Sequence, residues 1–207
     1  MTLYTPALFK EERPEVVLRL MREARLCLLV SNGAGGVPDI SHIPLQTDGK
    51  RVVGHLARAN PHWKALREAG RAIAVFPGPE GYISPNSYPT KAETHRVVPT
   101  WNYEAVHAEG PVEIVEDAAR LREIVTALTD QHEAKSAAPW SVDDAPAEFI
   151  ASQLKGIVGV VLTIESLTGK RKLSQNRNEA DRKGALDGLG PEDAALARSM
   201  RAARDGG

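Results

Sequence analysis

The sequence predicts a mainly β protein of the α+β class, in which short strands form a small barrel and helices are attached at its periphery. Short apolar segments are separated by turn residues at the spacing of hairpin strands. The regular alternation of strands and helices that a parallel doubly wound sheet needs is absent from the sequence. At 207 residues, the chain is also long enough to bury most of the apolar surface of its unfolded form.

The first third of the chain predicts a helix, three strands and a second helix. Apolar residues at helical spacing place the first helix at 11–24. Three strands joined as hairpins then follow, at 26–31, 37–46 and 50–58, with Asp48-Gly49 as the second turn. Asn60 as the cap and Gly70 beyond the end predict a short helix over 62–69.

The middle of the chain predicts further strands and a helical insertion. These strands are expected at 71–76, 82–84 and 100–115. The first of them should end at Pro77-Gly78-Pro79, and a polar loop is expected at 85–95. Asp117 and Pro146 each open a helix, and the two helices form an insertion at 117–155.

The C-terminal segment differs from the rest of the chain in charge. The almost continuously apolar run at 157–164 predicts the last strand, buried on both faces, and completes a first domain at 1–166. The segment 167–207 then has a local charge balance of +3, whereas the whole chain has −1. Pro191 opens a final helix within it.

Composition and charge exclude several classes of protein. A net charge of −1 gives no global attraction to nucleic acid or to an anionic membrane. No segment approaches the roughly 18 apolar residues of a membrane span, and residues 1–9 carry no basic leader, so we expect a cytoplasmic protein. The only cysteine, Cys27, lies in an apolar run and is expected in the core. No pair of histidines has metalloprotease spacing, so no metal site is expected.

The strand end before residue 60 is a candidate anion site. A helix that starts two residues after Arg58 presents the amides of His62 and Trp63 at its positive end, close to Lys64. A phosphate could bind there. The alternative is that Asn60 already satisfies those amides and that the cations are solvated.

The ring-rich strand is a candidate ligand wall. Trp101, Tyr103 and His107 alternate with Asn102 and Val106. Rings with polar tips need hydrogen-bond partners when they are buried, which favours a ligand wall over plain core.

Two further segments carry polar side chains. Residues 170–177 combine four cations with three neutral hydrogen-bonding side chains, which suits a phosphate or the carbonyls of a flat heterocycle. The alternative is a solvated tail. Ser41 and His42 point to opposite faces of a strand and cannot pair, so Ser41 is either a hydroxyl donor to a ligand or a solvent-facing residue.

Several segments resemble the PaiB family of FMN-binding negative transcriptional regulators, which is built on the split barrel of pyridoxamine-phosphate oxidases. They span most of the chain in the expected order. The segments that carry the resemblance are Gly54–Pro61 with Trp63, Tyr82–Pro85, Val98–Tyr103 with Ala105–His107, Gly169–Lys170, Lys172–Arg177 and Asp181–Arg182.

The resemblance implies an FMN-binding split barrel that forms a homodimer, with the cofactor in a groove between two barrels. It implies that the phosphate meets Ser41 and the segment 58–64, and that the segments 101–103 and 172–176 border the ring or the ribityl chain. The residues expected at the cofactor are Ser41, His42, Arg58, Asn60, His62, Trp63, Lys64, Trp101, Asn102, Tyr103, Lys172, Ser174, Gln175 and Asn176.

Three functions follow as hypotheses. The first is a dimeric flavin-binding regulator of gene expression, although the sequence contains no evident recognition helix for DNA. The second is a flavin-dependent oxidoreductase, in which His107 or Tyr103 could move a proton. The third is haem binding or breakdown, with His55, His62 or His107 as an axial ligand.

Overall fold

The computed structural model describes residues 3–205, which contacts divide into two compact units. Unit 1 contains Pro77–Val106 together with the described parts of the segments 1–20 and 168–207. Unit 2 contains Met21–Phe76 and His107–Leu167. Each unit is therefore assembled from segments that lie far apart in the sequence.

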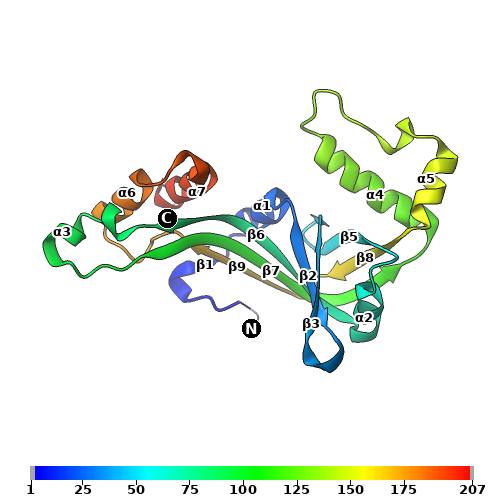
Figure 1. Cartoon of the computed structure of the whole chain (residues 1–207), viewed down its shortest axis with the longest axis horizontal. Helices are drawn as coiled ribbons and strands as arrows, with labels where there is room; N and C mark the ends of the chain where they lie inside the picture. Colours follow the sequence, from blue (N-terminus) through cyan, green and yellow to red (C-terminus); the bar gives the residue numbers. More distant parts are fainter. Residues whose placement is uncertain (1–2, 206–207) are drawn as a thin grey trace. The chain divides into compact units, whose positions relative to one another are not determined.

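The described residues form one antiparallel sheet system and seven α-helices (Figure 1). Hydrogen-bonded strands follow the order β3-β2-β6-β7-β8-β5-β4, and β9 pairs with β1 and with β7. The strands are β1 (Lys10–Glu11), β2 (Cys27–Asn32), β3 (Pro38–Ile43), β4 (Gln46–Thr47), β5 (Arg51–Ala57), β6 (Arg71–Ile83), β7 (Thr100–Val115), β8 (Ile157–Thr163) and β9 (Ser166–Lys172). The helices are α1 (Pro14–Glu23), α2 (His62–Ala69), α3 (Thr90–Thr94), α4 (Ala118–Glu133), α5 (Ala147–Leu154), α6 (Glu179–Asp187) and α7 (Ala194–Asp205).

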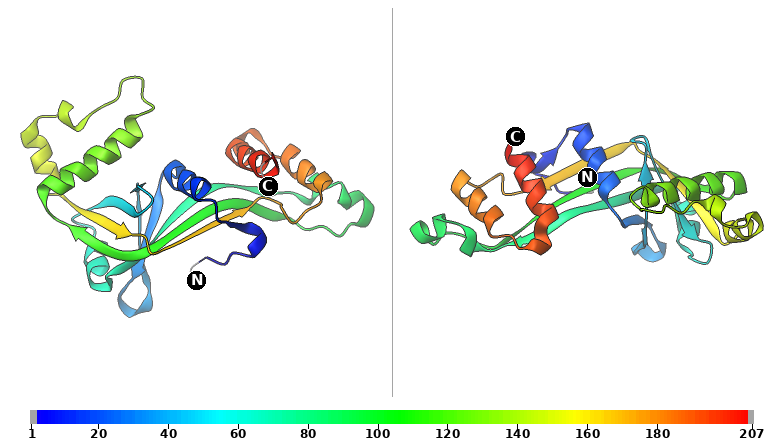
Figure 2. Two further views of the ribbon diagram at one scale, coloured as in Figure 1. Left: turned by 180° about the vertical axis from the view of Figure 1, so that it is seen from behind. Right: turned by 90° about the horizontal axis from the view of Figure 1, so that it is seen from above.

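In unit 2, the strand β8 lies between β5 and β7 and is buried over most of its length. Helices α4 and α5 lie against this part of the sheet, and two views in Figure 2 show them side by side. Their apolar side chains form one core with strand residues: Val115, Leu121, Ile124, Leu128, Val142, Ile150, Leu154 and Val161. The two helices predicted within 117–155 are present as α4 and α5, and Asp117 caps α4 by accepting from the amide of Arg120 at 2.9 Å.

In unit 1, β1 pairs antiparallel with β9, and helices α6 and α7 pack on a second core. That core contains Ile83, Tyr88, Leu173, Ala185, Leu196 and Met200. Glycines allow the close approach of α6, because a Cβ at Gly184 would lie 2.0 Å from the carbonyl oxygen of Ser87.

The strand predicted at 37–46 is wrong in one respect, because it is two strands with different partners. β3 pairs with β2, and β4 pairs with β5 through the Asp48-Gly49 turn. Pro44 lies between them, and a proline has no amide hydrogen to continue a ladder. The hairpin predicted through Asp48-Gly49 is therefore present, but only the short β4 takes part in it, while β3 pairs with β2.

The predicted break at Pro77-Gly78-Pro79 is also wrong, because β6 continues through it to Ile83. Within β6, the residues that pair with β2 are Ile73–Val75. The prolines lie beyond that pairing, so their missing amides remove no bond to β2.

The strand predicted at 157–164 is not the last strand of the sheet. The strand β9 follows, and two of its cations, Lys170 and Arg171, are buried. The solvated-tail interpretation is therefore wrong for these two residues. The first helix begins at Pro14 rather than at Glu11, which lies in β1.

Several other predictions are confirmed, and two helices are present that the sequence analysis does not predict. The helix over 62–69 and the long strand over 100–115 have the predicted bounds. Cys27 is buried, and burial raises the pKa of its thiol to about 12, as expected for a core residue. Helices α3 and α6 were not predicted. Within residues 3–205, no helix is both long and apolar enough to span a membrane.

Candidate functional site

The predicted site residues fall into two groups, one in each unit. Unit 2 contains Ser41, His42, Arg58, Asn60, His62, Trp63 and Lys64, and unit 1 contains Trp101, Asn102, Tyr103, Lys172, Ser174, Gln175 and Asn176. We describe each group on its own.

In unit 2, a buried serine–histidine cluster contains Ser31, Ser41, Asn60 and His62. The Nδ1 atom of His62 lies 2.8 Å from the Oγ atom of Ser41, and its Nε2 atom lies 3.1 Å from the Oγ atom of Ser31. Asn60 donates from Nδ2 to Ser41 Oγ at 3.0 Å. Burial lowers the pKa of His62, so the neutral imidazole is favoured.

Ser31 is a member of this cluster that the sequence analysis missed. It lies on β2 and points to the same face of the strand as the buried residues Cys27 and Leu29. A hydroxyl at the inward position of an otherwise apolar strand face was the available signal, because a buried hydroxyl needs a partner.

The helix start in unit 2 is already satisfied in part. Asn60 Oδ1 accepts from the amide of His62 at 3.0 Å, which is the alternative that the sequence analysis left open. Trp63 Nε1 donates to the carbonyl oxygen of Arg58 at 2.9 Å. His42, by contrast, is exposed on the other side of β3 from Ser41.

All three nitrogen atoms of the Arg58 guanidinium have protein acceptors. Nη1 donates to Glu116 at 2.7 Å, while Nε and Nη2 donate to the carbonyl oxygens of Lys155 at 3.0 Å and of Ile157 at 3.2 Å. Glu116 also pairs with Arg67 at 2.5 Å. Arg58 therefore connects β5, the end of α5 and β8 without any ligand.

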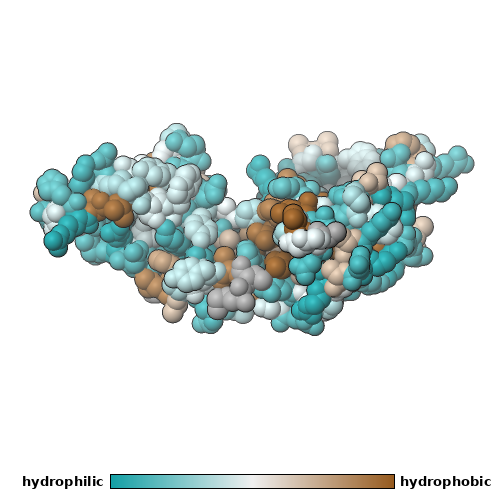
Figure 3. Space-filling model, turned by 60° about the horizontal axis from the view of Figure 1, so that its bottom comes forward, coloured by the Kyte–Doolittle hydropathy of each residue, from teal (hydrophilic) through white to brown (hydrophobic). Residues whose placement is uncertain are grey.

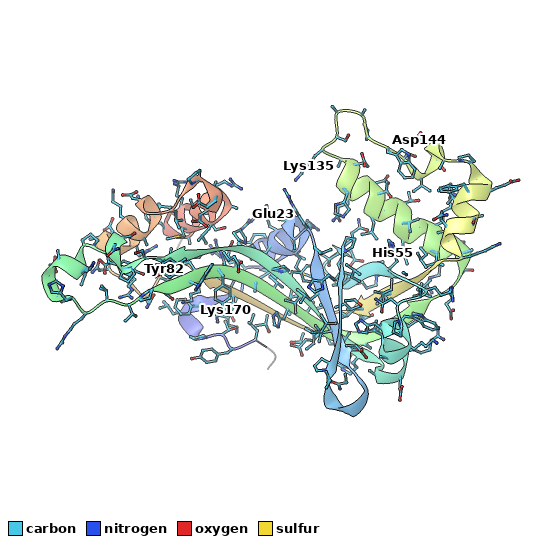
Figure 4. All side chains as sticks on the ribbon, viewed as in Figure 1. Glu23, His55, Tyr82, Lys135, Asp144 and Lys170 are labelled. Carbon is cyan, nitrogen blue, oxygen red and sulfur yellow. The ribbon has the colours of Figure 1, made fainter. Side chains whose placement is uncertain are left out.

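In unit 1, aromatic side chains lie exposed on one face of the sheet. Trp101 and Tyr103 are two residues apart on β7 and so share a face. Tyr82 of β6 contacts Trp101 edge to face, with ring centroids 6.0 Å apart. Trp101 is 54% exposed and Tyr82 is 50% exposed, so these rings are open to a partner. Tyr82 is labelled in Figure 4.

Cations of β9 lie beside these rings. The ammonium of Lys170 lies 5.0 Å from the ring centroid of Tyr103, and it donates to the carbonyl oxygen of Tyr4 at 2.8 Å. Lys172 donates to the carbonyl oxygen of Trp101 at 2.7 Å. We call Tyr82, Trp101, Tyr103, Lys170 and Lys172 the aromatic–cation face.

Asn102 points to the opposite face of β7 and is fully buried. Its Nδ2 atom donates to Ser174 Oγ at 2.9 Å, while its Oδ1 atom is buried without a partner among the described residues. Ser174 has a φ of 66°, which is rare for a residue with a side chain. Gln175 is bonded to backbone atoms of Arg171 and Leu173. Asn102 and Ser174 thus belong to the interior, whereas Gln175 is partly buried and Asn176 is exposed.

Two histidines of unit 2 have a buried ring nitrogen without a partner among the described residues. These are the Nδ1 atoms of His55 and His107. Burial lowers the pKa of both imidazoles, so both favour the neutral form. Across residues 3–205, no three side chains of His, Cys, Asp or Glu gather as metal ligands would.

Comparison with known proteins identifies the family. Residues 3–166 match the sequence model of a family described as "Putative FMN-binding domain". The "Protease synthase and sporulation protein PAI 2" of Bacillus subtilis is 32% identical over 202 residues, which cover 96% of this chain and 94% of that protein. An uncharacterized protein of Emericella nidulans is 31% identical, over 90% of each chain.

Solved structures share the fold at low sequence identity. The FAD and haem binding protein of Mycobacterium smegmatis has a TM-score of 0.62 at 17% identity, over 87% of this chain and 80% of that chain. A conserved hypothetical protein of Mycobacterium tuberculosis has a TM-score of 0.60 at 14% identity, over 86% and 95%. The predicted α+β class with a split β-barrel and peripheral helices is confirmed, and FMN is the cofactor that the matching family's description names. The chain belongs to this family of FMN-binding domains, and its likeness to PAI 2 confirms the resemblance to the PaiB family.

Proposed function

We propose that this protein binds FMN as a homodimer and acts as a negative regulator of gene expression of the PaiB type. The aromatic–cation face of unit 1 is the observation that carries the proposal. It combines exposed rings for a flat heterocycle with ammonium groups for a charged substituent. Bound FMN supplies one- and two-electron redox chemistry and a visible absorption band.

The residues of this face fit a flavin in two respects. Exposed Trp101 and Tyr82 offer ring faces and edges, and aromatic pairs of this kind contribute about 0.5–1.5 kcal/mol beyond area burial. Lys172 lies next to the backbone of Trp101, so a cation and a ring are available to one ligand. In unit 2, Ser41, Asn60 and His62 already bond to one another, and Arg58 already has acceptors.

A half-buried apolar face of the sheet in unit 2 supports the homodimer. Val30 of β2 pairs with Ile40 of β3 on one side and with Ile73 of β6 on the other. Leu28 of β2 pairs with Val75 of β6. Ile40 is 53% exposed and the other four are only partly buried. Contiguous apolar surface of this kind is typical of protein interfaces. The view in Figure 3 shows exposed hydrophobic patches among hydrophilic residues.

Two measurements test the cofactor and the assembly together. Native mass spectrometry of the protein reconstituted with FMN should give a dimer that carries two FMN molecules. Ile40→Asp should convert the dimer to a monomer, because it places a charge in the apolar face, whereas Val37→Asp is a control on an exposed loop residue. A wild-type protein that stays monomeric or binds no FMN contradicts the proposal.

The regulatory part is supported by the relative named for protease synthase and sporulation. A net charge of −1 gives little support to direct DNA binding, so the regulatory effect is tested on transcripts first. Deletion of the gene should raise the levels of specific transcripts. Unchanged transcripts, together with no salt-dependent retention of genomic DNA fragments by the purified protein, would refute the regulatory role.

A flavin-dependent oxidoreductase is a second candidate, favoured by the neutral His107 imidazole with an unpaired Nδ1 atom. Such a group can accept a proton. Stopped-flow mixing with NADH or NADPH distinguishes the candidates, because a regulator need not accept hydride at a useful rate. An absorption spectrum separates FMN from haem, for which His62 is a poor axial ligand because serine hydroxyls face both of its ring nitrogens.

A further inference from the structure

The segment that joins β6 to β7 surrounds a cavity in unit 1. The cavity has a volume of about 460 Å³, and the side chains that line it come from residues 86–95, which include the short helix α3. A water molecule takes about 30 Å³ in the liquid, whereas ligand pockets of proteins span roughly 300–1,000 Å³. The size of the cavity therefore suits a small organic molecule better than a single inorganic ion.

Helix α6 holds this segment in place, and Figure 1 shows α6 beside it. The buried carboxylate of Asp181 accepts from the amide of Thr90 at 3.1 Å. Asn178 donates to the hydroxyl of Thr90 at 3.2 Å. A Cβ at Gly188, at the end of α6, would lie 2.2 Å from the hydroxyl oxygen of Ser87, so the two segments are in close contact. The wall of the cavity is thus fixed before a ligand binds, which lowers the cost of ordering it.

The lining of the cavity carries a positive charge. Lys91 contributes an ammonium, and within the part of the chain that the structure describes no carboxylate lines the cavity. The ammonium donates to the side-chain oxygen of Asn86, which is a neutral group. Glu93 lies two positions further along α3, and residues two apart on a helix do not face one another. One compact ammonium favours a ligand with one negative charge.

Two more hydrogen-bonding side chains line the cavity. Tyr88 is 2% exposed, and its buried hydroxyl has no hydrogen-bond partner among residues 3–205. An unpaired buried hydroxyl is unfavourable, so an acceptor atom on a ligand would stabilise it. His95 has a φ of 54°, a left-handed conformation that glycine adopts at lower cost. A histidine at such a position favours a role for its side chain.

We propose that this cavity binds a small apolar carboxylic acid as its anion, and we call it the α3 cavity. The carboxylate pairs with Lys91, and the apolar body of the acid lies against Pro89 and Ala92, which complete the lining. An inorganic anion would leave most of the volume unfilled, and a neutral molecule would leave the ammonium without a counter-ion. The side chains of the α3 cavity are not among those expected at FMN, so the inference does not rest on the proposed function.

The test compares two probes that differ in charge and hardly in shape. Benzoate carries a carboxylate, whereas benzamide carries a neutral amide in its place. An NMR titration of the full chain with each probe gives the dissociation constant from the shifted signals of residues 86–95. The wild-type protein should bind benzoate at least roughly 10-fold more tightly than benzamide, the lower end of the range for a charged hydrogen bond.

The lysine variants test the charge. Lys91→Met should weaken benzoate by roughly 10- to 100-fold and leave benzamide within about 2-fold, because only benzoate uses the ammonium as a counter-ion. Lys183→Met is the matched control, since Lys183 is an exposed lysine of the same unit that pairs with Asp187. Its affinities for both probes should equal those of the wild type.

Two further variants separate ligand binding from a structural role. Tyr88→Phe and His95→Gly should each weaken benzoate by roughly 2- to 10-fold, the range for a neutral hydrogen bond. Neither should lower the thermal midpoint of the ligand-free protein. Tyr88→Phe removes an unpaired buried hydroxyl, and His95→Gly relieves a left-handed residue. A residue needed only for folding would give a lower midpoint instead.

Four outcomes overturn the inference. Benzoate and benzamide bind the wild type equally, or the signals that shift lie outside residues 86–95. Lys91→Met binds benzoate as tightly as Lys183→Met does. Saturating FMN displaces benzoate, which would make the cavity part of the flavin site. A wild-type protein that binds no FMN, but binds benzoate in a way that depends on Lys91, supports the α3 cavity and contradicts the proposed function.

Discussion

The two basic regions that the sequence singled out differ in what surrounds their charges. In unit 2, Arg58 and Arg67 share the carboxylate of Glu116. In unit 1, Lys170 and Lys172 contact rings, a hydroxyl and carbonyl oxygens, and among residues 3–205 no carboxylate pairs with either. A neutralised cation contributes to folding, whereas a cluster of unneutralised cations is available to a ligand. The comparison shows that cations which look alike in the sequence differ in whether a carboxylate neutralises them.

The strand β9 contains both kinds of cation within three residues. Arg171 has two carboxylate partners on one face, whereas its neighbours Lys170 and Lys172 have none on the other face within the described part of the chain. The distinction is therefore set by the face of the strand and not by the location of the segment. Four changes would break or sharpen this comparison.

The largest effect is expected at the neutralised cation of β9. Arg171→Met should destabilise the protein by about 3–5 kcal/mol, because it leaves Glu104 buried without a counter-ion. Urea unfolding followed by circular dichroism measures the change. Adding Glu104→Gln to Arg171→Met should recover part of the loss, and a single variant as stable as the wild type would contradict the assignment.

The second largest effect is a pH dependence of the free energy of unfolding at Glu11, which accepts a hydrogen bond from Arg171. The hydrogen bond from Arg13, with a smaller contribution from Arg171, lowers the pKa of Glu11 from 4.5 to about 2. The folded pKa lies below the unfolded one, so the stabilisation is complete above about pH 4.5 and is lost as the pH falls toward 2. Its full size is roughly 3 kcal/mol.

The control for this pH dependence is Glu11→Gln, which cannot titrate. Unfolding free energies of the two proteins should converge as the pH falls through this window. Buried neutral histidines also lose stabilisation on acidification, but below their ordinary pKa of 6.5 and equally in both proteins. A constant difference between the two proteins from pH 6 to pH 2 would rule out the shifted pKa of Glu11.

An intermediate effect is expected at the neutralised cation of unit 2. Arg58→Met removes a partly exposed ion pair and two hydrogen bonds to carbonyl oxygens. The expected loss is about 1–2 kcal/mol, since exposed pairs contribute little. Chemical denaturation gives the value, and Arg51→Met, which removes an exposed local pair with Asp48, should lose less.

The smallest effect on folding is expected at Lys172 of β9. Lys172→Met in the absence of ligand should change the free energy of unfolding by no more than about 0.5 kcal/mol, or raise it, because it removes a partly buried charge and relieves repulsion from Lys170 and Arg177. The thermal midpoint without flavin or phosphate checks this. A loss as large as that of Arg171→Met would show that Lys172 is a structural cation after all.

Local signals predicted the elements that depend on neighbours in the sequence. Asp117 caps α4 and Gly70 ends α2, because caps and left-handed residues act within one turn. The strand predicted at 100–115 has the expected bounds, and alternation along it puts the rings of Trp101 and Tyr103 on one face and the amide of Asn102 on the other. Pro77 and Pro79 misled the prediction, because the effect of a proline depends on whether its missing amide faces a partner strand.

By itself, the sequence determined the fold class, the family and the cofactor, because periodicity, caps and long motifs are local properties that survive without coordinates. Only the tertiary structure decided which cations are neutralised. Arg58 bonds to Glu116, Arg171 to Glu104 and Lys170 to the carbonyl oxygen of Tyr4, and these partners lie 58, 67 and 166 residues away along the chain. Charge compensation is a matter of distance in space, and composition along the chain does not contain that distance.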